Sequence, residues 1–411
     1  MKEHATADVL VVGGGAAGLF AAARLGADCR VAVAEFLVRP GMKLLASGNG
    51  RCNLTNRLAV ADFIASFGEK SRFVAPALRN FPPEKLLAFF RSRGIQFQVV
   101  DDFHYFPASG RAGDLLAALL DGSYELHTSC PVNRLLIRDG RVAGAASEDR
   151  EFHAEAVLIA AGSRARPALG GRGSAEPLAE QAGHHIVPPV PALAGLHTVE
   201  EWPGELAGIT LEDALVTLDR KLTGSGALLF TQNGISGPAV LDLAGAVNRR
   251  LAAGEVVSVS IDLHNFGAQR WREIFAARRE ISGAVRLPRL LKEYFPSRLV
   301  QRLEVPDVPL AKLSSGEREK LISELTAVRL TIRGSDSWDR AMAAEGGVAL
   351  DEVNPRTMES RLVKNLFFAG EFLDVTGRCG GYNLQWAFSS AALAADSIRR
   401  RLKELKQRGD E

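Results

Sequence analysis

The sequence predicts an α/β protein in which both ends of the chain build one domain and an insertion interrupts it. Residues 8–34 read as a strand, a glycine turn, a helix and a second strand, which is a βαβ unit. Residues 366–407 read again as a buried strand, a glycine-rich turn and a long helix. After a group of prolines near residue 190, strand-like segments replace this rhythm, so the insertion is expected to begin there.

Composition places the chain among ordinary globular proteins. Its 411 residues are 46% apolar and 24% charged, and a net charge of +2 excludes a polyelectrolyte. The most apolar stretch, residues 9–23, is shorter than the ~20 residues that span a bilayer. Four widely spaced cysteines suit neither a disulfide framework nor a zinc site: Cys29, Cys52, Cys130 and Cys379. We therefore expect a cytoplasmic protein with no metal and no membrane partner, and composition leaves its oligomeric state open.

Local patterns predict several elements between the two ends. Spaced Leu and Phe residues predict a helix at 83–93, and Asp139-Gly140 predicts a tight hairpin turn between two strands. Residues 156–162 read as a buried strand that ends on glycine. Ser314, followed by Glu317, predicts the start of a helix.

The first glycine turn has the spacing of a dinucleotide-binding motif. Gly13, Gly15 and Gly18 follow a strand and open a helix, so backbone can approach a pyrophosphate and the helix N-terminus can supply donors. Glu35 ends the next strand and is expected to accept the ribose hydroxyls of adenosine. An acid there disfavours a 2′-phosphate, so we expect FAD or NAD rather than NADP.

The C-terminal pattern favours FAD over NAD. Gly370-Glu371 ends a buried strand, and Gly380-Gly381 opens the last helix. Such an acid can hold ribityl hydroxyls, and a helix N-terminus can face the flavin pyrimidine edge, where reduction places negative charge. A loop at 43–56, dense in small and polar residues, can bring backbone N–H groups against flavin or phosphate, or it can be a polar surface turn.

These patterns divide the chain into three parts. The FAD-binding domain is expected at residues 1–190 and 345–411. A β-rich insert domain is expected at 191–265 and 328–344, and a helical insert at 266–327.

Several segments resemble the BaiN/YhiN-type bacterial flavoproteins, which are often labelled aminoacetone-oxidase-like NAD(P)/FAD-dependent oxidoreductases. They are GGGAAGL at 13–19, KLLASGNGRCNLTN at 43–56, LLFTQNGISGPAVLDLAG at 228–245, GGVALDEVNPRTMESRLVKNLFFAGEFLD at 346–374 and GGYNLQWAFSSA at 380–391. The resemblance covers nearly the whole chain. It implies a discontinuous, glutathione-reductase-like Rossmann FAD domain with an inserted β-barrel-like part and a helical part.

The resemblance also implies which residues hold the cofactor. The pyrophosphate would lie against Gly13, Gly15, Ala16 and Gly18, with Glu35 at the ribose. The flavin would be lined by Lys43, Ser47, Gly48, Asn49, Gly50, Arg51, Cys52 and Asn53. Val132 would meet the adenine through its backbone, and Gly162 would close the strand beside it. The ribityl chain would contact Glu371 beside Gly370, and the isoalloxazine would contact Gly380, Gly381, Asn383 and Leu384.

The expected activity is a flavin-dependent oxidation–reduction. Tightly bound FAD would accept hydride from NAD(P)H and pass it through N5 to an activated C=C bond, in a small enone or in uridine of ribosomal RNA, since relatives are linked to uridine reduction. No second G-x-G-x-x-G motif is visible, so NAD(P)H is expected to bind transiently or in a non-Rossmann manner. The alternatives are an O2-using amine oxidase and a non-catalytic flavin-containing factor that binds RNA or protein.

The sequence singles out no catalytic residue. Tyr382 can donate a proton beside flavin N5 or simply pack over the ring. Cys52 and Cys379 can form a redox pair or only pack. His104 and Tyr105 lie in an aromatic strip that suits either a substrate surface or a half-buried strand.

A basic segment and the tail are candidate RNA contacts. Residues 266–304 carry nine Arg or Lys against four Glu, a local net charge of +5. Four aromatic residues lie among them: Trp271, Phe275, Tyr294 and Phe295. This mixture can bind phosphates and stack on bases, or it can be a solvated helix face. The tail at 399–408 adds further basic residues.

Overall fold

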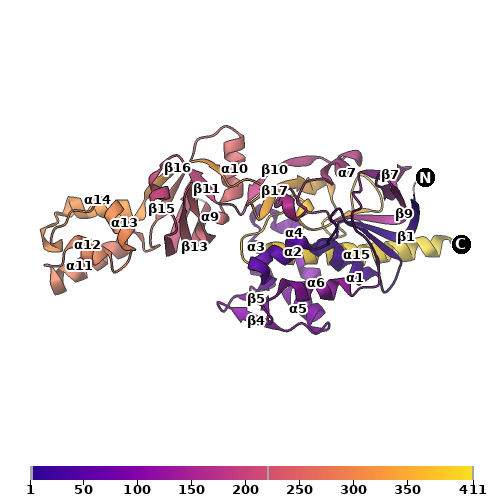
Figure 1. Cartoon of the computed structure of the whole chain (residues 1–411), viewed down its shortest axis with the longest axis horizontal. Helices are drawn as coiled ribbons and strands as arrows, with labels where there is room; N and C mark the ends of the chain where they lie inside the picture. Colours follow the sequence, from indigo (N-terminus) through magenta and orange to yellow (C-terminus); the bar gives the residue numbers. More distant parts are fainter. Residues whose placement is uncertain (1–2, 220–221, 410–411) are drawn as a thin grey trace. The chain divides into compact units, whose positions relative to one another are not determined.

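The computed structural model describes residues 3–219 and 222–409, and the chain divides into two compact units. The first comprises Met1–Val190 and Ala343–Glu411, and the second comprises Pro191–Met342. Both ends of the chain therefore belong to the first unit (Figure 1), and the second unit is an insertion into it.

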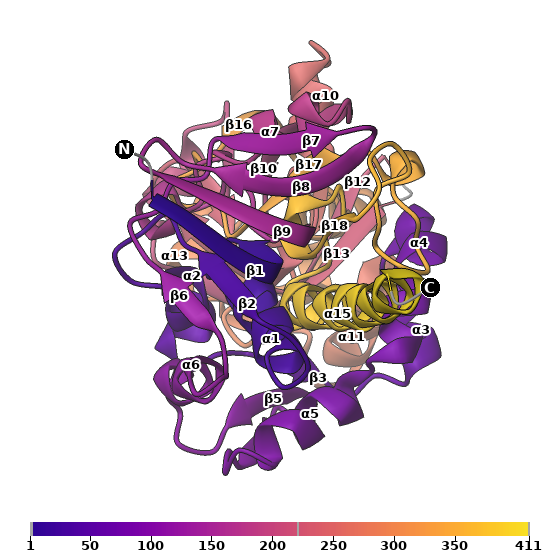
Figure 2. The ribbon, with the colours of Figure 1, turned by 90° about the vertical axis from the view of Figure 1, so that its right-hand side faces the viewer.

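A seven-stranded sheet forms the centre of the first unit (Figure 2). Its strands are β1 (Glu3–Val12), β2 (Val31–Ala34), β6 (Glu125–His127), β7 (Arg134–Arg138), β8 (Arg141–Ala146), β9 (Arg150–Ile159) and β18 (Leu366–Phe368). They run in the order β6-β2-β1-β9-β8-β7, and β18 also pairs with β9. The pairs β6–β2, β2–β1, β1–β9 and β9–β18 are parallel. Because parallel strands end at a common edge, the loops that follow β1, β2, β9 and β18 meet there.

The hairpin between β7 and β8 turns at Asp139 and Gly140, as predicted. Their φ angles are +49° and +69°, so both residues are left-handed. A two-residue turn of this kind matches the twist of the flanking strands. The expected hairpin is confirmed, with Arg138 paired to Arg141 across it.

Two helices that open on glycine turns pack against each other in the first unit: α1 (Ala16–Leu25) and α15 (Tyr382–Gly409). Figure 2 shows them side by side, and Phe20 of α1 meets Phe388 of α15 edge-on with ring centroids 5.1 Å apart. The remaining helices of this unit are α2 (Met42–Ala46), α3 (Val60–Ala65), α4 (Ser71–Asn80), α5 (Pro83–Arg91), α6 (Ala112–Leu120) and α7 (Glu176–Gln181). Short 3₁₀ turns are η1 (Ser47–Gly50), η2 (Gly68–Lys70), η3 (Pro167–Leu169), η5 (Leu350–Glu352) and η6 (Gly370–Phe372).

Two small sheets lie outside the seven-stranded sheet. A three-stranded sheet has the order β3-β5-β4, and its strands are β3 (Thr55–Asn56), β4 (Phe97–Val100) and β5 (His104–Pro107). A two-stranded sheet pairs β10 (Ile186–Ala192) with β17 (Ala343–Val348). The prolines near residue 190 therefore lie within a strand instead of only interrupting the chain. A strand with one partner tolerates them because one of its edges needs no N–H donors.

The second unit contains a closed antiparallel barrel in the order β11-β14-β13-β12-β15-β16. Its strands are β11 (Leu196–Thr198), β12 (Thr210–Leu218), β13 (Leu222–Thr231), β14 (Gly234–Ser236), β15 (Val257–Asp262) and β16 (Val328–Ser335). Three helices accompany them: α8 (Trp202–Glu205), α9 (Pro238–Leu241) and α10 (Ala244–Ala252). Closure pairs the strands on both sides and leaves no sheet edge open.

A helical part is inserted between β15 and β16. It consists of α11 (Gly267–Ser282), α12 (Leu287–Leu291), α13 (Ser297–Arg302), η4 (Leu310–Lys312) and α14 (Ser315–Thr326). The predicted start of α14 is confirmed, because Ser314 and Glu317 form a reciprocal capping box. The α/β class with a barrel-like and helical insertion is thus confirmed. Of the helices described, none combines the length and apolar character needed to cross a bilayer.

Candidate functional site

The first glycine turn joins β1 to α1 and leaves one glycine facing open space. A Cβ on Gly13 would lie 2.6 Å from the carbonyl oxygen of Ala160, and one on Gly18 would lie 1.9 Å from that of Gly13. These two glycines therefore allow close packing of the turn. A Cβ on Gly15, in contrast, would have no heavy atom within 4 Å. The turn can thus accept a pyrophosphate over Gly15, at the N-terminus of α1.

Glu35, at the end of β2, is buried beside this turn with 8% exposure. Its Oε2 accepts the Gly14 N–H at 2.6 Å, and its Oε1 accepts the Leu37 N–H at 2.7 Å. Each carboxylate oxygen has two lone pairs, so acceptor capacity remains for ribose hydroxyls. Gly14, which the sequence reasoning did not single out, is needed here because its Cβ would lie 2.9 Å from Oε2.

The turn after β18 brings a second glutamate to the same edge of the sheet. Oε2 of Glu371 lies 2.5 Å from Nζ of Lys43, and Oε1 accepts the Ala344 N–H at 3.1 Å. The preceding Gly370 has a φ of +74°, and its carbonyl accepts the Trp386 indole N–H at 3.1 Å. The predicted ribityl and flavin contacts, Glu371 and Lys43, are therefore adjacent to each other.

The loop after α2 has an unusual backbone. Gly48, Asn49, Gly50 and Cys52 all have positive φ angles between 54° and 85°. Asn49 and Arg51 are exposed, whereas Cys52 is fully buried and its N–H donates to the Ser47 carbonyl at 2.9 Å. Non-glycine residues adopt this conformation at a cost that functional loops can tolerate.

Two polar atoms next to this loop are buried without a hydrogen-bond partner in the described chain: Oδ1 of Asn53 and Oγ1 of Thr55. Leaving a buried polar atom unpaired costs about 1–3 kcal/mol. Such atoms are expected where a polar ligand completes the hydrogen bonds. A flavin, with its ring carbonyl and N–H groups and its ribityl hydroxyls, has the chemistry to fit them.

The N-terminus of α15 meets strand β3 closely. Gly380 and Gly381 have φ angles of +114° and +87°, and a Cβ on Gly381 would lie 2.7 Å from the Thr55 Cα. The Asn56 amide donates to the Gly380 carbonyl at 3.0 Å. Only glycine permits this approach, which places the helix N-terminus beside the unpaired Thr55 hydroxyl.

Of the other predicted contacts, Asn383 and Leu384 lie in the first turn of α15, whereas Val132 precedes β7 and Gly162 follows β9. The Asn383 side chain is engaged with Gly377, accepting its N–H at 2.8 Å and donating to its carbonyl at 2.9 Å. Leu384 is half-buried. Val132 is buried, and a Cβ on Gly162, beyond β9, would meet no atom within 4 Å.

The three catalytic candidates have different surroundings. Tyr382 is buried, and its ring packs against Phe63 with centroids 4.9 Å apart. Burial raises the pKa of the Cys52 thiol to about 12, so the thiol stays protonated at neutral pH. Cys379 is exposed.

His104 of strand β5 lies beside the N-terminus of α15. A Cβ on Gly380 would lie 2.9 Å from the His104 Nε2, so the imidazole stands directly against the glycine pair. On the other side of the ring, Nδ1 lies 3.6 Å from Oδ2 of Asp101. Its sequence neighbours did not indicate this position, which depends on the pairing of β5 with β3.

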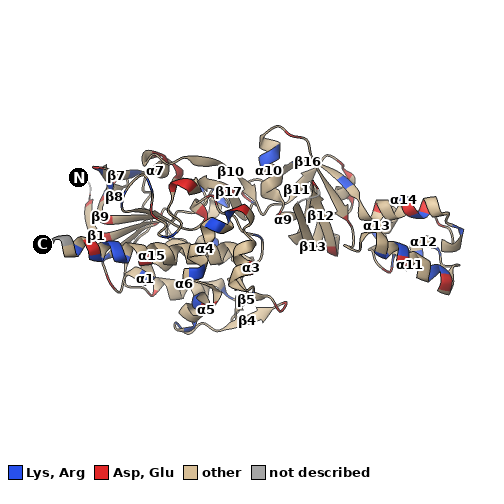
Figure 3. Ribbon diagram, turned by 180° about the vertical axis from the view of Figure 1, so that it is seen from behind, with Lys and Arg blue, Asp and Glu red and all other residues tan. Residues whose placement is uncertain are grey.

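The basic segment at 266–304, expected to be either an RNA contact or a solvated helix face, has fewer free rings and charges than its sequence indicates. Trp271, Phe275 and Phe295 are buried in the core of the second unit, so these rings are not available to stack on bases. Acidic residues neutralise several of its arginines, as the Arg272–Glu319 pair at 2.8 Å illustrates. Figure 3 shows basic and acidic residues interspersed on α11 and α14. The local net charge of +5 omits acids that folding brings in from outside the segment.

Strand pairing also gathers three possible metal ligands that lie outside this site. They are His4 of β1 and Glu151 and His153 of β9, whose ligand atoms lie within 4.8 Å of one another. An oxygen of Glu151 also lies 3.6 Å from Arg134, which competes with a metal for this carboxylate, and His4 is exposed. We assign no ion to this cluster.

The fold and the paired glycine turns define a Rossmann-type dinucleotide-binding protein with an inserted barrel. The family model described as HI0933-like protein Rossmann domain matches residues 7–397, and the chain belongs to this family. The resemblance to BaiN/YhiN-type flavoproteins is thereby confirmed. The chain is accordingly a flavin-dependent oxidoreductase of an FAD-binding family.

Two relatives match over almost their whole length. The 3-dehydro-bile acid delta(4,6)-reductase of Clostridium scindens is 33% identical, and the ribosomal RNA dihydrouridine synthase of Escherichia coli is 31% identical. Each alignment covers 95% of this chain and 98% of the relative. A crystal structure of 3-ketosteroid delta1-dehydrogenase from Sterolibacterium denitrificans shares the fold, with a TM-score of 0.53, 12% identity, and coverage of 96% of this chain and 100% of that one. The relatives' names favour a reductase over an oxidase.

Proposed function

We propose that this protein uses tightly bound FAD for the NAD(P)H-driven reduction of an activated C=C bond. The observation that carries the proposal is the convergence of both glycine turns at one sheet edge, next to the unpaired atoms of Asn53 and Thr55. FAD, when bound, supplies the two-electron hydride transfer that this reaction needs. The names of the two relatives support the substrate chemistry, since dihydrouridine forms when the C=C bond of uracil is saturated.

In this proposal the first unit holds the cofactor along the sheet edge. The turn from Gly13 to Gly18 binds the pyrophosphate, and Glu35 binds the adenosine ribose, with Val132 and Gly162 beside the adenine. Glu371 accepts from ribityl hydroxyls while Lys43 holds its carboxylate in place. The 47–53 loop and the glycine pair before α15 would hold the flavin ring, and Asn53 and Thr55 would complete its hydrogen bonds.

The N-terminus of α15 has an electrostatic task. The first N–H groups of a helix lack intrahelical partners and carry a partial positive charge. Gly380 and Gly381 bring these groups close to the loop at Thr55 without a side chain between them. The helix can therefore stabilise the negative charge that a reduced flavin carries.

His104 is our candidate proton donor. Saturating a C=C bond conjugated to a carbonyl adds hydride at one carbon and a proton at the other. The His104 Nε2 lies at the glycine pair, where a proton can be delivered, and Oδ2 of Asp101 lies 3.6 Å from Nδ1 on the other side of the ring. Cys52 is less suited, because a thiol with a pKa of about 12 gives up its proton poorly.

Uridine in ribosomal RNA and a small enone both contain a C=C bond conjugated to a carbonyl, so the experiment tests each of them as a substrate. Purified yellow protein is mixed anaerobically with NADH or NADPH, and flavin bleaching at 450 nm is followed. The reduced protein is then mixed with a uridine-containing ribosomal RNA transcript or with a 3-keto-4-ene steroid. Reoxidation by either substrate supports the proposal, and mass mapping of the RNA should show uridine +2 Da.

Other outcomes contradict it. Bleaching by a primary amine alone would indicate an oxidase. No bleaching by any donor would indicate a flavin-containing binding factor. Either result would overturn the reductase proposal.

A further inference from the structure

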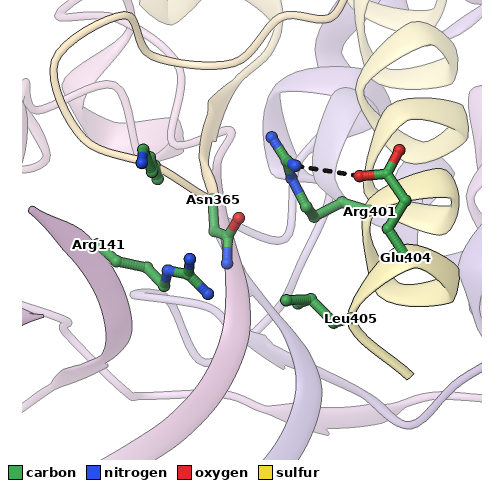
Figure 4. A pocket seen from close by; sticks show the side chains of 6 residues that line it. Arg141, Asn365, Arg401, Glu404 and Leu405 are labelled. Atoms are coloured by element: carbon green, nitrogen blue, oxygen red, sulfur yellow. Dashed lines mark hydrogen bonds and ion pairs between the residues drawn. The ribbon is translucent and has the colours of Figure 1, made fainter. Parts of the chain in front are cut away.

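A pocket of about 110 Å³ lies at the start of β18, whereas the Gly370-Glu371 turn follows the end of that strand. Figure 4 shows Asn365 between Arg141 of β8 and Arg401 of α15. The pocket is lined by Arg141, Lys364, Asn365, Arg401, Glu404 and Leu405. None of these residues belongs to the proposed flavin site.

Positive charge dominates the lining. Three cations line it, Arg141, Lys364 and Arg401, together with one carboxylate, Glu404, which lies 3.1 Å from an Arg401 nitrogen. Arg141 and Lys364 have no acidic partner within residues 3–219 and 222–409, in contrast to most arginines of the helical insertion. Two cations that line the same pocket, neither of them paired with a carboxylate, repel each other unless an anion lies between them.

Backbone hydrogen bonds hold these cations together. The Lys364 N–H donates to the Gly140 carbonyl at 3.0 Å, and the Val142 N–H donates to the Lys364 carbonyl at 3.0 Å. The loop before β18 is thus fastened to the β7–β8 hairpin. Both cations are carried by fixed backbone, although their side chains are exposed.

Arg401 is held in place by Glu359, which also binds the backbone of the buried residue Asn365. Asn365 is 1% exposed with a φ of +63°, and its side-chain amide donates to the Glu155 carbonyl at 2.9 Å. Oε1 of Glu359 accepts the Asn365 N–H at 2.9 Å, and the same carboxylate lies 3.4 Å from Arg401. The guanidinium is therefore tied to the backbone at Asn365 through Glu359.

We propose that this pocket binds a phosphate group, carried either by a polynucleotide or by a small phosphorylated molecule. A guanidinium offers paired N–H donors that match a tetrahedral oxyanion, and an ammonium adds a compact charge. The volume accommodates one such group. The tail expected to contact RNA supplies Arg401, and folding adds Arg141 and Lys364 from two distant segments. The Arg408 side chain lies outside the described part.

The test compares two charge-removing variants of the flavin-loaded full chain. The pocket variant is the double change Arg141→Gln and Lys364→Gln. The control is Lys403→Gln, which removes an exposed charge on α15 that does not line the pocket. Calorimetric titration with inorganic phosphate and fluorescence anisotropy with a labelled single-stranded RNA are measured for each protein over a range of KCl. Flavin content and NADPH-dependent bleaching show whether the proposed function is intact.

We expect the pocket variant to bind phosphate or RNA about tenfold more weakly, with the control within about twofold of the unmodified protein. If RNA is the source, the salt slope falls by about 0.7 for the one lost phosphate contact. A loss for phosphate without a loss for RNA identifies a small phosphorylated ligand. Unchanged binding of both probes, or an equal loss in the Lys403→Gln control, would overturn the proposal, whatever the bleaching result.

Discussion

Nζ of Lys43 lies 2.5 Å from Oε2 of Glu371, although 328 positions separate the two residues in the chain. The contact joins the helix after β2 to the turn after β18. It is half-buried, with 31% and 19% of the two side chains exposed. It ties the N-terminal part of the chain to its C-terminal part at the proposed ribityl position.

Glu371→Gln tests this contact. The amide keeps the shape but loses the charge that Lys43 pairs with, so FAD affinity should fall about tenfold or more. The measurement is the FAD dissociation constant from fluorescence titration of apoprotein. Arg24→Met is the matched control, because Arg24 pairs with Asp396 at 2.9 Å with similar exposure, between α1 and α15. Equal flavin loss in both variants would mean that the Lys43–Glu371 contact only stabilises the fold.

Alanine substitutions should separate the roles of two glycines. At Gly15 the φ angle is −86° and a Cβ meets open space, so Gly15→Ala should leave the melting temperature of the apoprotein nearly unchanged yet weaken FAD binding. At Gly18 a Cβ would lie 1.9 Å from the Gly13 carbonyl oxygen, so Gly18→Ala should lower that temperature markedly. Normal FAD binding by Gly15→Ala would remove Gly15 from the pyrophosphate site.

Burial of Cys52 predicts an alkaline loss of stability. Its pKa is about 12 in the folded protein and 9.0 for an ordinary thiol, so the unfolded chain releases the proton first as pH rises. The contribution of the protonated Cys52 thiol to the free energy of unfolding is complete below pH 9. It falls by at most about 1.4 kcal/mol per pH unit between pH 9 and pH 12. Urea unfolding at pH 8 to 11 should therefore be less pH-dependent for Cys52→Ala than for the unmodified protein.

Thiol labelling tests the same burial in the folded protein, where iodoacetamide should label exposed Cys379 well before Cys52. Rapid labelling of Cys52 would contradict its burial.

Changing His104 should affect only one half of the reaction. His104→Gln removes the proposed proton donor, so reoxidation of reduced enzyme by substrate should slow by about 10²–10⁴-fold. Bleaching by NAD(P)H needs no such proton and should keep its rate. Asp101→Asn should have a smaller effect, because Asp101 is 74% exposed and acts only through the ring. Stopped-flow measurement of each half-reaction checks this, and an equal slowing of both would point to a structural role.

Loss of the cap of α14 should destabilise the insertion alone. Ser314 Oγ accepts the Glu317 N–H at 3.2 Å, and Glu317 Oε2 accepts the Ser314 N–H at 2.8 Å. Ser314→Ala removes one half of this box and should lower the melting temperature of the second unit by about 2–4 °C. Flavin content should not change, since every proposed FAD contact lies in the first unit. Restoration by Ser314→Asp would show that the cap is responsible.

Turns and helix caps are the features that the sequence predicts best. The turn at Asp139-Gly140, the cap at Ser314 and the glycine turns at 13–18 and 380–381 were all predicted, because each depends on conformations that few residues adopt. Strand β10 was not predicted as a strand, because its prolines read as chain punctuation and its single partner is distant in sequence. The net charge of +5 counted over residues 266–304 is not the charge of the folded insertion, since the acids Glu319 and Glu205, which pair with its arginines, lie outside the counted segment.

The sequence by itself determined the α/β class, the discontinuous domain and the family, because these follow from periodicity and from motifs that are contiguous in the chain. Only the tertiary structure decided which side chains meet. It placed Lys43 against Glu371, His104 against Gly380, and Arg141 beside Lys364 and Arg401. The physical reason is that such contacts depend on strand order and on helix packing, and neither leaves a local signal in a single sequence.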